Sequence, residues 1–272
     1  MKFTCHVVMS MAVLSWSLLI QAPTAAAGQV PVRFPEGASH AVLIVRSLNN
    51  QEMGRGDLTE TVDGDRVTSK LALHFNDGSI YQETTQFTQD GAFHVTHYDL
   101  IQKGPSFPQA LEMTMDVPDQ TVTVRSTGDE GKQKAWTRHV RIPRDVANGI
   151  VPFLVRNMPS DPGEERVSMI VATPDPKLVR LTISPMRSEV FPFDGSKLEA
   201  TRYAIRADLT GFVGSLVKIT GRQPPPSFIW MLQGNVPSFL MAQEDLVDGP
   251  VCRIELTTPV LPANPDRKGA GY

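Results

Sequence analysis

Three histidines and one aspartate are the side chains of this sequence best suited to metal binding or acid–base catalysis: His74, His94, His97 and Asp99. Imidazole and carboxylate groups ligate metals and transfer protons near neutral pH. Residues three apart on a β-strand point to opposite faces, so we expect His94 and His97 not to converge. Solvent-facing histidines are the interpretation we favour, and we predict no catalytic residue, metal site or cofactor. A hydrolase of unknown substrate that uses these histidines stays as an alternative.

The glycine-rich and acidic stretches match no nucleotide or calcium motif. Gly211, Gly214 and Gly221 have neither P-loop nor dinucleotide spacing, and bulges or tight bends explain them better. No Gly-x-Ser-x-Gly nucleophile elbow occurs. The acidic residues at 161, 164 and 165 lack the alternation of a calcium loop and indicate a solvated loop.

Residues 1–27 have the pattern of a secretory signal peptide. Lys2 supplies a positive charge, residues 7–20 are mostly apolar, and residues 23–27 (PTAAA) offer a helix break and small residues for cleavage. Removal of 27 of the 272 residues near Ala27 leaves 245, with 25 basic and 29 acidic residues, because Lys2 is the only charged residue lost. We therefore expect export to the periplasm or the extracellular medium.

Export also bears on the two cysteines. Cys5 leaves with the signal peptide, so Cys252 has no partner for an internal disulfide. Cys252 belongs to an alternating segment in which it shares one strand face with Ile254 and Leu256. The pattern predicts a buried, unreactive thiol rather than a nucleophile.

The composition is that of an ordinary folded chain. It is 41% hydrophobic and 20% charged, which supplies enough apolar mass for a substantial core. The formal net charge of −3 argues against a nucleic-acid partner, because proteins held on nucleic acid by charge are usually basic. No apolar run reaches the roughly 18 residues of a membrane span, so we expect no transmembrane segment in the mature chain.

From Gly56 onward, apolar residues recur with period two, and a turn signal follows about every ten residues. Asp-Gly pairs at 63–64, 77–78 and 90–91 separate four alternating segments, which predicts a β-meander. Further strands are expected at 111–117, 121–125, 136–142, 167–173, 178–184, 197–209, 212–220, 228–232, 239–243 and 251–257. The predicted fold is mainly β: a curved antiparallel sheet, half-barrel or β-sandwich of about a dozen strands.

One segment has a helical pattern instead. Val146, Ile150 and Leu154 recur every four residues, with Asp145 as a possible N-cap. Gly149 interrupts the pattern, as does a proline at 152, so we expect one short or kinked apolar helix that packs on a sheet face. The domain organisation we predict is a signal peptide at 1–27, one β-rich domain at 28–258 and a frayed tail at 259–272.

Two late strands, at 228–232 and 239–242, are apolar on both faces. Such a strand is either covered on both sides or lines a cavity with one of them. Core packing is the plain interpretation, and a pocket for a lipid-like ligand is the functional one. The candidate ligand-binding residues are Val146, Ile150, Leu154, Phe228, Trp230, Leu232, Phe239 and Met241.

Several stretches resemble a family of exported bacterial proteins of unknown function. They are residues 101–108 (IQKGPSFP), 145–150 (DVANGI), 221–225 (GRQPP) with Trp230 after them, and 249–256 (GPVCRIEL). This resemblance implies export and a β-rich fold, and it carries no catalytic residue. A strand meander with one apolar helix is also similar in architecture to periplasmic half-barrels, some of which carry lipoproteins or lipids.

The function we expect is therefore a non-enzymatic exported binding protein for a lipid-like or otherwise apolar ligand. Its apolar strands would contact the ligand, with the helix behind them. The first alternative is an envelope-assembly or protein-interaction protein whose apolar surface meets another protein of the envelope. The hydrolase is the second.

Overall fold

The structure is a computed structural model that describes residues 30–127, 131–159, 163–173, 175–193, 196–208, 226–247 and 249–258. The predicted signal peptide, the predicted tail, the expected strand at 212–220 and the glycines at 211, 214 and 221 lie outside the described residues. So does the stretch at 221–225.

In the described part of the chain, fourteen strands form one antiparallel sheet. The first eight are β1 (Ser39–Ser47), β2 (Glu52–Asp63), β3 (Arg66–Phe75), β4 (Ile80–Thr88), β5 (His94–Lys103), β6 (Ala110–Asp116), β7 (Thr121–Thr127) and β8 (Gln133–His139). A helix, α1 (Val151–Asn157), comes next. The last six are β9 (Glu165–Val171), β10 (Lys177–Phe193), β11 (Ser196–Asp208), β12 (Ser227–Leu232), β13 (Ser238–Asp245) and β14 (Val251–Leu256).

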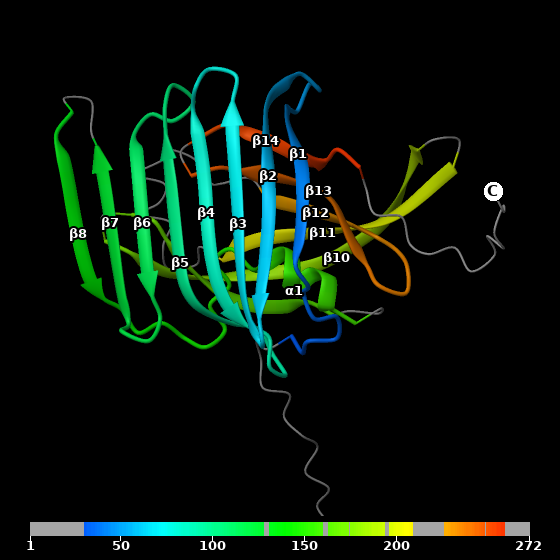
Figure 1. Cartoon of the computed structure of the whole chain (residues 1–272), viewed down its shortest axis with the longest axis horizontal. Coiled ribbons are helices and arrows are strands. Elements are labelled where there is room, and N and C mark those ends of the chain that lie inside the picture. The colour runs from blue at the N-terminus through cyan, green and yellow to red at the C-terminus, as the bar shows by residue number, and fades with distance from the viewer. Residues whose placement is uncertain are drawn as a thin grey trace, which may run out of the picture.

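Two meanders make up the sheet, and they meet in its middle. The strand order is β8-β7-β6-β5-β4-β3-β2-β1-β14-β13-β12-β11-β10-β9, so the chain runs outward to one edge, crosses to the other and returns. The seam is the pairing of β1 with β14, in which Leu43 faces Leu256 and Val45 faces Ile254. Figure 1 shows β1 beside β14 and the two meanders as separate arms of the sheet.

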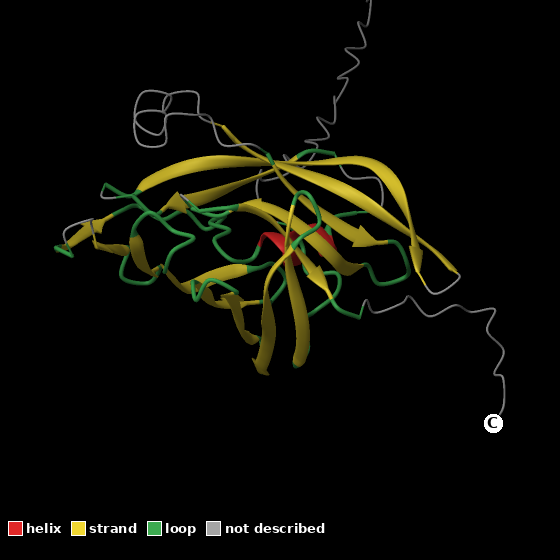
Figure 2. Cartoon of the chain, turned by 90° about the horizontal axis from the view of Figure 1, so that it is seen from above, coloured by secondary structure: helices red, strands yellow, loops and turns green. Residues whose placement is uncertain are grey.

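The sheet curves back on itself around α1. Figure 1 shows β1–β8 in front of β9–β14 with α1 between them, and Figure 2 shows the helix enclosed by strands from the perpendicular direction. Most buried apolar side chains of both arms and of α1 form one main core, which includes Leu73, Met113, Ile150 and Ile183. The predicted fold class, a mainly β protein with a curved antiparallel sheet and a short apolar helix, is confirmed.

The predicted Asp-Gly turns are confirmed as the hairpin connections. Gly64 joins β2 to β3 with φ of +62°, and Gly78 joins β3 to β4 with φ of +86°. Glycine adopts this left-handed conformation without the Cβ clash that other residues suffer. The turns therefore set the register in which Leu58 faces Leu71 across β2 and β3.

The helix begins later than the sequence pattern predicts. α1 starts at Val151, and the proline at 152 stands in its first turn, where a missing N–H costs least. Gly149 has φ of +71°, which ends any helical path from Asp145. The prediction of Asp145 as N-cap is wrong: its carboxylate accepts a hydrogen bond from the Ser168 hydroxyl at 3.0 Å and pairs with Arg180.

The segment before the helix instead covers the edge of the sheet at β9. The Ala147 N–H donates to the Ser168 carbonyl at 2.8 Å, and the Ser168 N–H donates to the Asp145 carbonyl at 3.0 Å. The Asn148 amide exchanges two hydrogen bonds of 2.9 Å with the backbone of Ile170. The backbone groups of Ser168 and Ile170 on this edge are thereby satisfied within the molecule.

Cys252 is fully buried on β14, as predicted, and burial raises the pKa of its thiol to about 12. The neighbouring carboxylates of Glu244 and Asp245 raise this pKa further, so the thiol stays protonated. Within the described ranges, no helix is both long enough and apolar enough to cross a membrane.

Candidate functional site: a cavity between the two arms of the sheet

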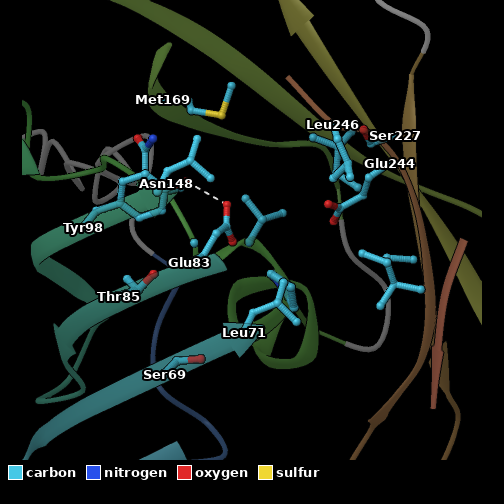
Figure 3. A pocket seen from close by; sticks show the side chains of 18 of the residues that line it. Ser69, Leu71, Glu83, Thr85, Tyr98, Asn148, Met169, Ser227, Glu244 and Leu246 are labelled. Carbon is cyan, nitrogen blue, oxygen red and sulfur yellow. Dashed lines mark hydrogen bonds between the residues drawn. The ribbon is translucent and has the colours of Figure 1, made fainter. Parts of the chain in front are cut away.

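A cavity of about 2050 Å³ lies between the two arms. Inward-facing residues of both arms line it, together with residues of α1 and of the segment before it. Leu71 on β3, Met169 on β9 and Leu246 after β13 are among its apolar walls (Figure 3). Protein interiors normally contain few voids larger than a water molecule, so a space of this size is a feature of the fold that packing alone does not explain.

The strand pattern explains why this space has apolar walls. On β3, Ser69 and Leu71 line the cavity, whereas Lys70 between them is exposed. On β12, Ser227, Ile229 and Met231 line it. Alternate residues of a strand point to the same face, so each arm presents one row of side chains to the interior.

A polar cluster interrupts the apolar wall on β4 and β5. The hydroxyls of Tyr81 and Tyr98 each donate a hydrogen bond of 2.7 Å to Oε1 of Glu83. All three side chains line the cavity, and Figure 3 shows the bond from Tyr98 to Glu83. Burial raises the pKa of Glu83, and the two hydrogen bonds oppose this rise because they stabilise the carboxylate.

A second carboxylate, Glu244 on β13, projects into the cavity from the other arm (Figure 3). Burial raises its pKa to about 7, and the negative charge of Glu83 adds to the rise. The Glu244 carboxylate forms no hydrogen bond or ion pair with any residue that the structure describes. A lone carboxylate in a largely apolar site is costly unless a partner reaches it.

Gln102 on β5 is a third polar residue of the cavity wall. It pairs with Tyr81 across β4 and β5, and its Nε2 donates a hydrogen bond of 2.7 Å to the carbonyl of Val247, which follows β13. The residue is 2% exposed and lines the cavity. Its Oε1 has no hydrogen-bond partner among the described residues, which leaves a buried acceptor unsatisfied.

A further set of polar side chains lies elsewhere on the cavity wall. The guanidinium of Arg156 on α1 forms an ion pair with the buried carboxylate of Glu36, and the Ser39 hydroxyl donates to Glu60 at 3.0 Å. Burial raises the pKa of Glu36 to about 7 despite the opposing effect of Arg156, and burial also raises the pKa of Glu60. This group binds α1 to the N-terminal segment of the domain.

Of the eight residues predicted to bind a ligand, Phe239 lines the cavity. Val146, Ile150 and Leu154 are buried in the main core instead. Trp230 and Leu232 belong to a second apolar cluster on the opposite face of β12, against which Phe228 and Met241 pack. The Trp230 indole N–H donates to Glu189 at 3.0 Å in this cluster.

A β-bulge explains the separation of Phe239 from Met241. Trp230 faces Met241 and Met231 faces Phe239, so Leu240 is an extra residue on β13. The extra residue reverses the alternation, which turns Phe239 toward the cavity and Met241 toward the second cluster.

A similar bulge corrects the prediction for the histidines. Phe87 faces Val95 and Gln86 faces His97, so Thr96 is the extra residue on β5. His94 and His97 therefore share the outer face of the strand, and the prediction of opposite faces is wrong. His97 Nε2 lies 2.9 Å from Oδ2 of Asp99, whose other oxygen accepts a hydrogen bond from Thr114.

His94 has a different neighbour, the carbonyl of Arg144 at 3.5 Å. His74 is exposed on β3. Across the residues described, no group of three His, Cys, Asp or Glu side chains is placed to hold a metal ion.

Sequence reasoning did not identify the cavity carboxylates Glu83 and Glu244. Their signal was a charged residue in an inward-facing row: Glu83 alternates with Tyr81, Thr85 and Phe87.

Comparisons with protein-family models, curated proteins and solved structures find no match to this chain.

Proposed function

We propose that this chain is an exported, non-enzymatic protein that binds a lipid-like or otherwise apolar molecule in the cavity between the two arms. The observation that carries the proposal is the cavity itself, with a volume of about 2050 Å³ and apolar side chains from both arms. Pockets for small ligands usually measure about 300–1,000 Å³. The larger space suits a molecule with a long hydrocarbon chain.

The N-terminal pattern supports the exported part of the proposal. Cells that express the full chain should yield a mature protein that begins at Gly28, as measured by the intact mass of the exported fraction. Retention of residues 1–27 in that fraction would contradict it.

The binding part is tested by filling the cavity. Leu58 and Leu71 face each other across β2 and β3, and both line the cavity. Replacing both by tryptophan, L58W/L71W, should weaken binding of the fluorescent apolar probe N-phenyl-1-naphthylamine at least about tenfold. The matched control, T59W/K70W, changes the adjacent pair of the same strands on the outer face.

Native mass spectrometry of the purified mature protein is the second measurement. We expect a bound apolar molecule, and a thermal stabilisation when a lipid is added to the extracted protein. A protein that is empty, binds no probe and shows no thermal shift with any lipid would refute the proposal. Equal loss of probe binding in both double variants would show that the probe does not report on the cavity, and would equally count against it.

A further inference from the structure

We propose that the ligand of the cavity carries a protonated amine, held by the carboxylates of Glu83 and Glu244 and by the side-chain carbonyl of Gln102. This inference rests on the proposed binding function and names the chemical class of the ligand: a cationic amphiphile, with an ammonium head and a hydrocarbon tail. The carboxylates come from β4 and β13, so each arm of the sheet supplies one (Figure 3).

The first argument is the chemistry of the available groups. Oε1 of Glu83 already accepts two tyrosine hydrogen bonds, and Oε2 is not engaged by them. The Glu244 carboxylate has no partner among the described residues, and neither has Oε1 of Gln102. The open groups of this cluster are thus all acceptors. An ammonium group has three donors and no acceptor, which is one donor for each of the three groups.

The buried Oε1 of Gln102, which has no partner among the described residues, is an observation independent of the two acidic residues. Its Nε2 is held by the Val247 carbonyl, so the amide orientation is fixed and Oε1 is left as a buried acceptor. An unsatisfied buried acceptor costs free energy in the empty protein. A ligand that donates a hydrogen bond there recovers this cost on binding, which a purely apolar ligand cannot do.

The second argument is charge. In the structure described, no lysine, arginine or histidine pairs with Glu83 or Glu244. The ion pair on this cavity's wall is elsewhere, between Arg156 and Glu36. An anionic head group, such as a fatty-acid carboxylate, would bring a third negative charge to the cluster. A cationic head group instead neutralises the negative charge of the carboxylates, and the apolar walls of the cavity strengthen the attraction between the opposite charges.

The apolar walls determine where the tail lies. Leu71, Met169 and Leu246 line the same space as the cluster (Figure 3). An ammonium at Glu83 and Glu244 therefore has its hydrocarbon chain in contact with apolar side chains of both arms.

Three ligands with the same twelve-carbon tail test the inference: dodecylamine, dodecanol and dodecanoic acid. Each is titrated into the extracted mature protein at pH 8.5, which lies above the pKa of about 7 of Glu244 and at which an alkyl ammonium is still protonated. Displacement of N-phenyl-1-naphthylamine reports binding. We expect dodecylamine to bind at least about tenfold more tightly than dodecanol, and dodecanoate to bind most weakly.

The variant E83Q/E244Q removes both charges and keeps the shape of the side chains. It should lose the tenfold preference for dodecylamine while its affinity for dodecanol stays within about twofold of the unmodified protein. E112Q, which changes an exposed glutamate on β6, is the matched control and should keep the preference. Far-ultraviolet circular dichroism checks that each variant is folded.

Equal binding of the three ligands, or tightest binding of dodecanoate, would overturn the ammonium inference and leave the proposed apolar-ligand function standing. Retention of the preference in E83Q/E244Q would also overturn it. If none of the three ligands displaces the probe and the probe itself does not bind, the proposed function fails, and the inference fails with it.

Discussion

Replacement of Glu244 by glutamine should stabilise the ligand-free protein at alkaline pH and leave it nearly unchanged at acidic pH. The pKa of Glu244 rises from 4.5 to about 7 on folding, because burial and Glu83 disfavour its charge. The folded state therefore binds the proton more tightly than the unfolded state does. Below about pH 4.5, Glu244 is protonated in both states and its burial costs no ionisation energy. As the pH rises from about 4.5 toward 7, the free energy of unfolding falls, because the unfolded state ionises first. Above about pH 7 the full loss of stability remains.

The magnitude follows from the two pKa values. A pKa difference of 2.5 corresponds to about 3 kcal/mol in the free energy of unfolding. Relaxation of the surroundings around the charge lowers this cost, so about 3 kcal/mol is the upper limit. Glutamine is neutral at every pH, so E244Q should be more stable than the unmodified protein at pH 8 by about 1–3 kcal/mol. In a domain of this size, that equals a rise of about 2–12 °C in the melting temperature.

Urea unfolding followed by tryptophan fluorescence at pH 5 and pH 8 measures the effect. E112Q is the control, because its side chain is 53% exposed and its ion pair with Arg125 is loose at 3.8 Å. We expect E112Q to change stability by less than about 1 kcal/mol at both pH values. The reasoning fails if E244Q is less stable than the unmodified protein at pH 8, or if its effect is the same at pH 5 and pH 8.

Three further predictions concern the backbone and the thiol. Gly149→Ala should cost about 3 kcal/mol or more in unfolding free energy, because a Cβ at φ +71° overlaps the Thr85 hydroxyl. The control, Gly64→Ala, has open space around it and should cost about 1 kcal/mol. Equal costs would contradict the clash. Asn148→Ala should cost about 2–4 kcal/mol in unfolding free energy, because both hydrogen bonds of Asn148 to β9 are lost. The Ile170 amide should exchange faster in hydrogen-exchange measurements. An unchanged exchange rate would argue against the role of Asn148 at the sheet edge. Cys252 should not react with Ellman's reagent in the native protein and should react fully in urea, because its pKa is about 12 and it is buried; rapid native labelling would refute its burial.

The strands were predictable because their signals are local. Alternation on residues 67–75 and the Asp-Gly turns at 63–64 and 77–78 together specify a hairpin without reference to the rest of the chain. Strand β1 escaped prediction although Leu43 and Val45 alternate with exposed or partly exposed residues. Its partner β14 lies about two hundred residues away in sequence, and local patterning does not indicate such a pairing.

The site was less predictable than the fold for two physical reasons. Period-two reasoning assumes an uninterrupted pleat, and the bulges at Thr96 and Leu240 each shift the alternation by one residue. Hydrophobic patterns also direct attention to apolar residues, whereas the groups that make this cavity distinctive, Glu83 and Glu244, are polar. Both come together only through the curvature that sets one arm opposite the other.

The seam between β1 and β14 has a consequence for the order in which this protein is completed. Residues 251–256 are synthesised about two hundred residues after β1. Until β14 is made, the edge of β1 that pairs with it is open, and the β1–β14 pairing that joins the two arms is absent. The cavity between the two arms is therefore complete only after β14 has paired with β1, and a chain that lacks residues 251–256 has no completed cavity in which to bind a molecule.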